Sequence, residues 1–364
     1  MAEETKKRKA EHIKICMNQK AQARNATTGF ENIHLIPKAL PELNKGKINL
    51  STSVFEHKFA APIIVGAMTG GTEEATKINA SIAEAVEELH LGMGVGSQRA
   101  AIEDKQLAKT FSIARKKAPT AFLIANIGGV QLVHGYGVSE VKKAIKMIEA
   151  DALAIHLNAL QEAVQPEGQT NFEGVLEKVA EIARSVDKPV IVKETGAGIA
   201  AEEALKLEAA GVRGIDVGGC GGTSFAAVEY FRSEKEEQRS LACAFWDWGI
   251  PTAASLVEVT QKVKIPVVAS GGLRTGIHAA KALALNAGLC SISQPVLEAA
   301  AKGANETRRI LSCLTEELRN VMFLVGAGTI KDLTKTPVVI TGKTAEWLIA
   351  RGFDIGSYAR RRSV

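Results

Sequence analysis

The stretch LEAAGVRGIDVGG (207–219) decides the fold of this chain. It has the pattern of a helix end, a glycine turn and a short apolar strand that runs into further glycines. The same order of features recurs in IEADALAIHLN (148–158) and LALNAGLCSISQ (283–294). Short, continuous apolar runs are typical of parallel strands that are covered on both faces. The repeat therefore predicts consecutive strand–helix units.

The same pattern extends in both directions and gives eight candidate strands. They are Pro62–Gly66, Leu91–Val95, Ala121–Asn126, Leu153–Leu157, Val190–Lys193, Gly214–Val217, Val267–Ser270 and Leu289–Ser293. Helical patterns lie between them, for example at Ala75–Glu88, Val175–Arg184, Ala201–Ala210 and Ile277–Asn286. This alternation indicates an α/β fold with a parallel sheet, and eight units favour a closed (β/α)8 TIM barrel. The alternative, an open doubly wound sheet, would require a GxGxxG turn after an early strand, and the sequence shows no convincing one.

Two segments fall outside the eight units. We expect residues 1–60 to form an N-terminal arm and covering segment, and residues 61–364 to form the barrel, within a single structural domain. Residues 224–252, after the sixth strand, form an insertion that carries FWDWG (245–249). A length of 364 residues is compatible with one barrel.

Composition argues against several classes of protein. Apolar residues make up 46% of the chain, enough for a large core, whereas aromatic residues make up only 5%, which argues against a base-stacking surface. The net charge of +5 would help to attract an anionic substrate, but no basic run is long enough to follow a polyanion. No secretory signal is present, and no apolar run reaches the length of about 18 residues that a membrane span needs.

The five cysteines are scattered and form no CxxC pair. This pattern indicates reduced thiols in a cytoplasmic protein, without a disulfide framework or a zinc site. Cys220 sits among glycines with no histidine nearby in sequence, and we interpret it as a small packing residue.

In a barrel of this kind the active site lies at the carboxyl ends of the strands. The loops after the seventh and eighth strands, SGGLRTG (270–276) and SISQ (291–294), are placed to form a phosphate site there. Gly271 and Gly272 would let backbone N–H groups approach a phosphate, and Thr223 could add a hydroxyl. The alternative is that these glycines serve turn geometry alone.

Lys193 ends the fifth strand, which is apolar until that point. It shares a face of the strand with Ile191, because side chains alternate along a strand. A lysine at the mouth of the barrel needs an anionic partner, since burying an unpaired charge is costly. A reduced flavin could supply the anion, and a structural ion pair is the alternative.

A second polar cluster ends the fourth strand. His156 and Asn158 share a face because they are two residues apart, and Gln161 and Glu162 follow within the next turn. Glu162 suits Mg²⁺, which binds through one or two carboxylates together with substrate phosphate oxygens and water.

Three basic residues, Arg8, Lys9 and Arg99, are candidates for clamping a diphosphate. Arginine offers a planar fork of donors and lysine a compact charge. Taken alone, Arg8 and Lys9 could equally form a solvated tail.

Together these motifs resemble one family, the type 2, FMN-dependent isopentenyl-diphosphate delta-isomerases. The matching strings are RKAEHI (8–13), AMTGG (67–71), GSQRA (96–100), ANIGG (125–129), HLNALQE (156–162), VKETG (192–196), GGTS (221–224), DWGIPT (247–252) and SGGLRTG (270–276). They cover nearly the whole chain, and HLNALQE, RKAEHI and DWGIPT are the most specific. The chain departs from the family at Ser291-Ile292-Ser293-Gln294, where the family has smaller apolar residues.

The resemblance implies a set of site residues. It implies FMN contacts from Ala67, Met68, Thr69, Ser97, Asn126, Lys193, Thr223, Gly271, Gly272, Leu273, Ser293 and Gln294. It implies substrate contacts from Arg8, Lys9, Ser97, Gln98, Arg99, His156, Asn158 and Gln161, and Mg²⁺ on Glu162. Catalytic roles would fall to Gln161, His156, Lys193 and Glu229.

The resemblance also implies a reaction. Isopentenyl diphosphate and dimethylallyl diphosphate would interconvert by a 1,3-allylic proton shift that needs reduced FMN and Mg²⁺, within isoprenoid biosynthesis and without net redox change. NAD(P)H is the expected reductant. A homo-oligomer, either a tetramer or an octamer, is the expected assembly, and neither nucleic acid nor membrane is expected as a partner.

Three other functions share parts of this pattern. A 2-hydroxyacid oxidase would need a histidine base beside an arginine pair late in the chain, whereas His278 falls inside a predicted helix. A relative of inosine-monophosphate dehydrogenase would need a nucleophilic cysteine, which Cys220 matches only loosely. A non-catalytic barrel that binds a phosphate ligand would leave Lys193, Glu162 and His156 without a role.

Overall fold

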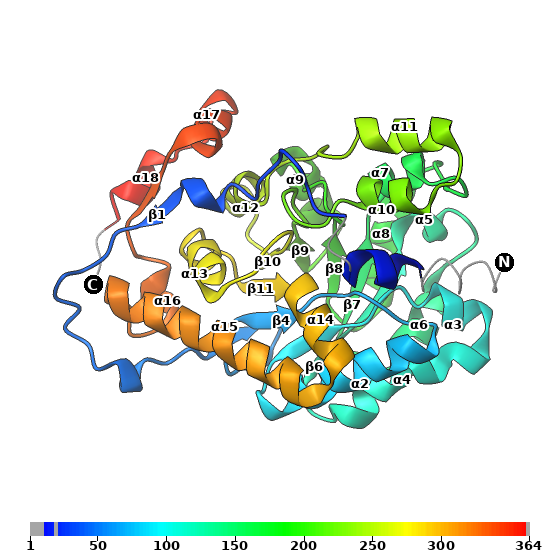
Figure 1. The fold of residues 1–364 in the computed structure, drawn as a ribbon, viewed down its shortest axis with the longest axis horizontal. Coiled ribbons are helices and arrows are strands. Elements are labelled where there is room, and N and C mark those ends of the chain that lie inside the picture. The colour runs from blue at the N-terminus through cyan, green and yellow to red at the C-terminus, as the bar shows by residue number, and fades with distance from the viewer. Residues whose placement is uncertain (1–10, 18–20, 362–364) are drawn as a thin grey trace.

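The structure is a computed structural model that describes residues 11–17 and 21–361. Eight parallel strands close into a barrel in the order β10–β11–β4–β5–β6–β7–β8–β9 (Figure 1). They are β4 (Ile63–Val65), β5 (Gly92–Gly94), β6 (Phe122–Gly128), β7 (Ala152–His156), β8 (Val190–Lys193), β9 (Gly214–Asp216), β10 (Val267–Ala269) and β11 (Leu289–Ile292). Each predicted strand corresponds to one of these, so the predicted barrel is confirmed.

Helices surround the barrel and connect its strands (Figure 1). Those between β4 and β8 are α2 (Glu73–Glu88), α3 (Arg99–Glu103), η3 (Lys105–Ala108), α4 (Lys109–Lys117), α5 (Gly129–Leu132), α6 (Val138–Met147), α7 (Ala159–Val164) and α8 (Val175–Ser185). Those between β8 and the end of the barrel are α9 (Ala201–Ala209), α10 (Phe225–Arg232), α11 (Glu236–Ala244), α12 (Thr252–Thr260), α13 (Gly276–Ala284), α14 (Gln294–Lys302) and α15 (Ala304–Val325). Helices α10 and α11 form the predicted insertion after the sixth barrel strand.

Helix α2 shows how the sequence builds one unit. The Thr72 side chain accepts a hydrogen bond from the Ala75 N–H and so caps the first turn. Ile78, Ile82 and Val86 recur at a spacing of four residues and are buried. This spacing places them on one face of the helix, which packs toward the strands.

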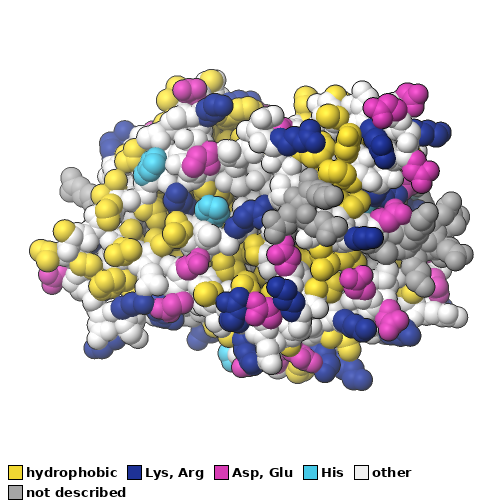
Figure 2. All heavy atoms as spheres, viewed as in Figure 1, with side chains coloured by type: hydrophobic (Ala, Val, Ile, Leu, Met, Phe, Trp, Pro, Cys, Tyr) yellow, Lys and Arg dark blue, Asp and Glu magenta, His cyan; other side chains and the backbone are white. Residues whose placement is uncertain are grey.

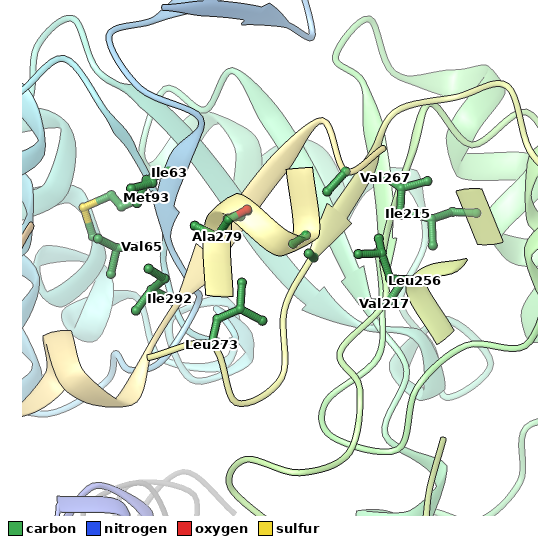
Figure 3. Close-up of a cluster of buried hydrophobic side chains, with 14 of the residues drawn as sticks. Ile63, Val65, Met93, Ile215, Val217, Leu256, Val267, Leu273, Ala279 and Ile292 are labelled. Carbon is green, nitrogen blue, oxygen red and sulfur yellow. The ribbon is translucent and has the colours of Figure 1, made fainter. Parts of the chain in front are cut away.

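The main hydrophobic core fills the space between the strands and the surrounding helices (Figure 3). Ile63 and Val65 of β4 lie beside Met93 of β5. Ile292 of β11 and Ala279 of α13 belong to the same cluster. These side chains alternate along each strand with others that point into the barrel, so each strand is buried on both faces.

A separate apolar cluster fills the barrel at the amino ends of the strands. The antiparallel hairpin of β2 (Thr52–Val54) and β3 (His57–Phe59) supplies part of it. The ring of Phe122, the first residue of β6, lies with its centroid 5.3 Å from that of Phe59 and 6.0 Å from that of Phe55. The hairpin therefore closes this end of the barrel, which leaves the carboxyl ends as the open side.

An early and a late segment of the chain pair with each other outside the barrel. Strand β1 (Ile33–Leu35), labelled in Figure 1, pairs antiparallel with β12 (Val338–Ile340), and neither strand belongs to the barrel sheet. The remaining elements of this region are η1 (Phe30–Asn32), η2 (Lys45–Lys47), α16 (Ile330–Leu333), α17 (Gly342–Ala350) and α18 (Gly356–Ala359).

The surface carries both signs of charge. On the face shown in Figure 2, Lys and Arg side chains alternate with Asp and Glu side chains rather than forming a continuous basic track. Within residues 11–17 and 21–361, none of the helices combines the length and the apolar character that crossing a membrane requires.

We expect Phe122→Ala to lower the free energy of unfolding by about 3–5 kcal/mol, because it leaves a cavity among the rings that close the barrel. Urea unfolding at neutral pH measures this change. Leu40→Ala is the matched control, since that side chain is 76% exposed and its loss should change stability little. An equal effect of the two substitutions would show that the hairpin does not support the barrel.

Candidate active site

A cavity with a volume of about 290 Å³ lies at the carboxyl ends of the barrel strands. Most of the residues predicted for the site contribute to its lining. These are Ala67, Met68, Thr69, Ser97, Arg99, Asn126, His156, Asn158, Gln161, Glu162, Lys193, Thr223, Gly271, Gly272, Leu273, Ser293 and Gln294. The barrel thus brings together side chains from every part of the chain between residues 67 and 294.

The strand register places a row of three polar side chains along the floor of the cavity. His156 of β7 is opposite Lys193 of β8, and Lys193 is opposite Asp216 of β9. Two residues earlier on β8, Ile191 belongs to the apolar cluster inside the barrel. The predicted shared face of Ile191 and Lys193 is therefore confirmed, and the polar row forms the floor of the cavity directly above the apolar cluster.

Lys193 is held at this floor by the backbone. Its ammonium group donates a hydrogen bond to the carbonyl oxygen of Glu194 at 2.7 Å. The ammonium therefore sits at the cavity lining, where it can offer its remaining N–H donors to an anionic ligand.

The Glu194 side chain folds under the loop that follows β8. Its Oε2 accepts hydrogen bonds from the backbone N–H groups of Thr195, Gly196 and Ala197 at 2.5–2.6 Å. Burial raises the pKa of the Glu194 carboxyl to about 7, although these N–H donors and the Lys193 charge oppose the rise. The loop therefore contains a carboxyl group that exchanges its proton near neutral pH.

A chain of hydrogen bonds fixes His156. The Asn126 side-chain amide donates to the carbonyl oxygen of Val95 at 3.1 Å, which turns its Oδ1 toward His156 Nδ1 at 2.9 Å. Because Oδ1 can only accept, this arrangement assigns the proton to Nδ1 of His156. The ring is thereby held in one orientation at the cavity.

Gln98 does not line the cavity, contrary to the predicted substrate contact. It is fully buried, and its amide donates to the carbonyl oxygen of Ala144 at 2.9 Å. Its Oε1 accepts from the backbone N–H of Asn126 at 2.9 Å. Its neighbour Ser97 lines the cavity. Gln98 therefore supports Asn126 from behind rather than reaching a ligand.

Glu162 and Asn158 form an oxygen-rich corner. The Glu162 carboxylate accepts hydrogen bonds from Asn158 Nδ2 at 3.0 Å, Gln165 Nε2 at 2.5 Å and Gln169 N at 2.8 Å. Asn158 Oδ1 is buried and has no hydrogen-bond partner within the described part of the chain. A carboxylate beside an unsatisfied amide oxygen is a donor set that fits a hard cation such as Mg²⁺. No group of three or more His, Cys, Asp or Glu side chains suited to a metal occurs in residues 11–17 and 21–361, so water and substrate oxygens would have to complete the shell.

Glu229 lies on α10 behind this corner and outside the cavity lining. It is fully buried, accepts from Gln161 Nε2 at 3.1 Å and contacts His12 Nε2 at 3.1 Å. It also pairs with Arg232 one turn later. Burial disfavours its charge, yet His12, Arg232 and Gln161 outweigh burial and hold the pKa of Glu229 below its ordinary value. Glu229, predicted to be catalytic, contacts the cavity-lining Gln161 through its carboxylate, and its catalytic role stays a prediction.

The helical residues 11–17 cross the carboxyl side of the barrel, seen as the dark blue helix in Figure 1. His12 and Cys16 of this segment line the cavity. The contact of His12 with Glu229 fastens the segment to α10. Arg8 and Lys9, predicted to clamp the diphosphate, lie outside the described residues.

Two glycine turns and a helix end form the opposite side of the cavity. Gly271 and Gly272 have φ values of +99° and +76°, which side-chain-bearing residues rarely adopt. A Cβ at Gly222 would lie 2.5 Å from the Gly272 backbone nitrogen, so the two turns are in close contact. Gln294 begins α14, and its position in the lining places the N-terminus of this helix at the same end of the cavity. Backbone N–H groups and a helix N-terminus are features that bind phosphate.

Arg274 is a residue of this end that sequence reasoning missed, although it lies inside SGGLRTG (270–276). It lines the cavity, and its guanidinium bonds to the side-chain oxygens of Gln294 and Gln22. Both partners are neutral, so its charge remains available to an anion. The side-chain amide of Gln294 is occupied by Arg274 and Glu298, which leaves the backbone of the Ser293–Gln294 turn to face a ligand.

The remaining lining also fits a flavin. Thr69 Oγ1 is buried, lines the cavity and has no hydrogen-bond partner in the part of the chain that the structure describes. A Cβ at Gly96 would lie within 2.7 Å of the Thr69 backbone. An unsatisfied hydroxyl, glycine walls and a phosphate-binding end are compatible with a planar, phosphate-bearing cofactor.

Three further residues were missed, and two of them carried a readable signal. Asp216 is the charged residue of an apolar strand, the same signal that identified Lys193. His12 lies inside the quoted motif RKAEHI (8–13). Arg232 carried only the weak signal of its i,i+3 spacing to Glu229 within the insertion.

Cys220 and His278 have the surroundings that the sequence predicted, a buried packing position and a helix. Cys220 is buried, and burial raises the pKa of its thiol to about 11, so it is not a ready nucleophile. His278 lies in α13 and stacks on Phe30 with ring centroids 5.6 Å apart. It does not belong to the cavity lining, where a hydroxyacid oxidase would need its base.

Comparisons with known proteins agree with this site. Residues 1–128 and 139–340 match the family model described as FMN-dependent dehydrogenase. The chain therefore belongs to the FMN-dependent dehydrogenase family. It is 51% identical over 370 residues to a relative from Pyrococcus abyssi, covering 100% of this chain and 99% of the relative. It is 49% identical over 354 residues to a relative from Methanothermobacter thermautotrophicus, covering 97% and 99%. Both relatives are named isopentenyl-diphosphate delta-isomerase, and the chain belongs to their family, which confirms the resemblance seen in its motifs.

Solved structures show the same fold at low identity. A mandelate oxidase with an FMN adduct has a TM-score of 0.61 and 18% identity, and the match covers 90% of this chain and 92% of that one. A lactate oxidase of Pediococcus acidilactici has a TM-score of 0.62 and 20% identity, with 94% of each chain covered. At this identity the likeness establishes the barrel architecture alone.

We expect Glu229→Gln to lower the free energy of unfolding at pH 7 by about 1.5–3 kcal/mol, because it removes charge-assisted hydrogen bonds to His12 and Arg232. The pKa of Glu229 is lowered in the folded protein, so its contribution is complete above the ordinary value of 4.5 and is lost as the pH falls through the folded value. The difference in the free energy of unfolding between wild type and Glu229→Gln should therefore become smaller below about pH 4.5.

Urea unfolding at several pH values measures this gap. Glu237→Gln, on the exposed surface of α11, is the matched control and should leave stability unchanged. A gap that stays constant down to pH 3 would mean that Glu229 is not ionised in the folded protein.

Proposed function

We propose that this protein interconverts isopentenyl diphosphate and dimethylallyl diphosphate. The observation that carries the proposal is the full-length identity of about half with curated relatives of that name. The cavity supports it, because its lining combines the features of a phosphate site, a cation at the floor and the oxygen-rich corner at Glu162.

The cofactor of this proposal is FMN. Gly271, Gly272 and the N-terminus of α14 would bind its phosphate, with Arg274 as the compensating charge. Thr69 and Asn126 would meet its ring, and Lys193 would compensate the negative charge of the reduced form. When bound and reduced, the flavin supplies a proton-transfer group and an electron-rich ring for an alkene that is a very weak base.

Glu162, with Asn158 Oδ1, is the proposed place of Mg²⁺. One carboxylate suffices for this ion when diphosphate oxygens and water complete its shell. Arg99 lines the same cavity and would add a planar fork of donors. Holding the diphosphate in this way uses binding energy remote from the reacting carbons to position them.

The remaining residues orient the substrate and move protons. Gln161 lines the cavity with its amide fixed by Glu229, and His156 is held in one orientation by Asn126. The helical residues 11–17 would shield the cavity from water, which an alkene protonation requires because water competes for the proton. The flavin must arrive reduced, and NAD(P)H is the proposed reductant.

The likeness to hydroxyacid oxidases favours a second function less well. Those enzymes would need a histidine base near an arginine pair late in the chain. The late histidine, His278, stacks on Phe30 and lies outside the cavity lining.

The experiment that tests the proposal is an anaerobic assay with isopentenyl diphosphate, FMN, a reductant and Mg²⁺, with product analysis by mass spectrometry or NMR. Dimethylallyl diphosphate should form only when flavin is reduced. Omitting the reductant, the flavin or the metal provides the controls. Full turnover without flavin, or with oxidised flavin, would contradict the proposal.

We expect Glu162→Gln to weaken the apparent affinity for Mg²⁺ by about 10- to 100-fold, because it removes the carboxylate from the oxygen-rich corner. The measurement is the Mg²⁺ dependence of turnover at saturating substrate. FMN content should stay constant, since Glu162 is not among the proposed FMN contacts. Glu177→Gln, on the exposed face of α8, is the control. An unchanged Mg²⁺ requirement would remove Glu162 from this role.

A further inference from the structure

Asp216 is a buried carboxylate that the proposed reaction does not use. It ends β9, is 7% exposed and lines the cavity. Removing a carboxylate from water is costly unless a cation and hydrogen bonds compensate it. An acidic residue at this position of an apolar strand therefore needs a partner.

The strand register places a cation near Asp216, and the Lys193 charge acts on its carboxyl group. Asp216 is directly opposite Lys193 on the neighbouring strand, and both side chains line the same cavity. Asp216 Oδ1 accepts a hydrogen bond from the backbone N–H of Gly218 at 3.3 Å and is also hydrogen bonded to the hydroxyl of Ser270. Burial raises the pKa of Asp216, whereas Lys193, Ser270 and Gly218 oppose the rise. The Lys193 charge and these two hydrogen bonds are thus the contacts that favour the ionised form of Asp216 over the neutral form.

We propose that Asp216 is the buried counter-charge of Lys193, and that it limits the positive field which this lysine places on a bound flavin. The inference rests on the proposed FMN site. Asp216 is a positioning residue, because it acts through the Lys193 ammonium rather than on the substrate. Its link to Ser270, which directly precedes Gly271, also connects the cationic floor with the glycine turn at the phosphate end.

The opposite charges of Asp216 and Lys193 predict the direction in which the midpoint potential of the flavin changes when Asp216 is replaced. Reduced FMN carries more negative charge than oxidised FMN, so a stronger positive field favours the reduced state. Replacing Asp216 with a neutral residue leaves the Lys193 charge uncompensated. The flavin should then become easier to reduce, and its midpoint potential should rise.

The test is an anaerobic redox titration of the FMN-loaded protein for wild type, Asp216→Asn, Lys193→Ala and the double variant. We expect Asp216→Asn to shift the equilibrium toward reduced flavin by about tenfold, equivalent to about 30 mV for a two-electron couple. In the Lys193→Ala background the shift should largely disappear. Without the lysine, burial drives Asp216 to its neutral form, and Asn is then nearly equivalent in charge.

Ser270→Ala is the matched control, because it removes the hydroxyl contact and keeps the carboxylate. Its effect on the potential should be clearly smaller than that of Asp216→Asn, and Asp216→Glu should restore a potential close to that of wild type. If Asp216→Asn does not accumulate as folded protein, Asp216→Ser provides the neutral side chain in the same two backgrounds.

Two other outcomes of the redox titration would overturn the inference. An unchanged or lowered potential in Asp216→Asn would mean that Asp216 carries no charge that opposes Lys193. An equal shift in both backgrounds would mean that Asp216 acts without Lys193. Failure of the wild-type protein to bind FMN at all would instead refute the proposed function, so the two failures are distinguishable.

Discussion

The register between β7, β8 and β9 is the constraint on which the site depends. It aligns His156, Lys193 and Asp216 in one row at the carboxyl ends of the strands. Because side chains alternate along a strand, a slip of one residue would turn any of these groups into the apolar layer between strand and helix. The strand residues that face that layer, such as Val65, Val192 and Ile292, are buried and aliphatic. The packing of the outer core and the polar groups of the inner surface therefore favour the same register.

Polar and apolar layers share the interior of the barrel in a fixed order. Phe59 and Phe122 fill the amino end, and Ile191 lies in the same cluster below Lys193. Within the barrel interior, the charged groups Lys193 and Asp216 thus lie at the carboxyl ends of the strands. Burial strengthens their mutual interaction and makes any unpaired member costly. The apolar cluster at the closed end of the barrel therefore raises the cost of an unpaired charge at the open end.

Much of the fold and part of the site could be predicted from the sequence. Short apolar runs define barrel strands because both faces of each strand are buried, and Lys193 was visible as the charged end of such a run. Asp216 carried the same signal and was overlooked. Gln98 was misplaced because its direction depends on the loop after β5, where strand alternation no longer applies. The contact between His12 and Glu229 joins residues 217 positions apart, and local pattern holds no information about such a pairing.

The pairing of β1 with β12 has a consequence for the synthesis and folding of the protein. Residues 33–35 are synthesised long before their partner strand at 338–340. During translation the early strand presents unsatisfied backbone groups, a state that invites pairing with other chains. Pairing at this edge therefore waits until residues 338–340 have been synthesised, and a chain truncated before residue 338 has a strand β1 without its native partner.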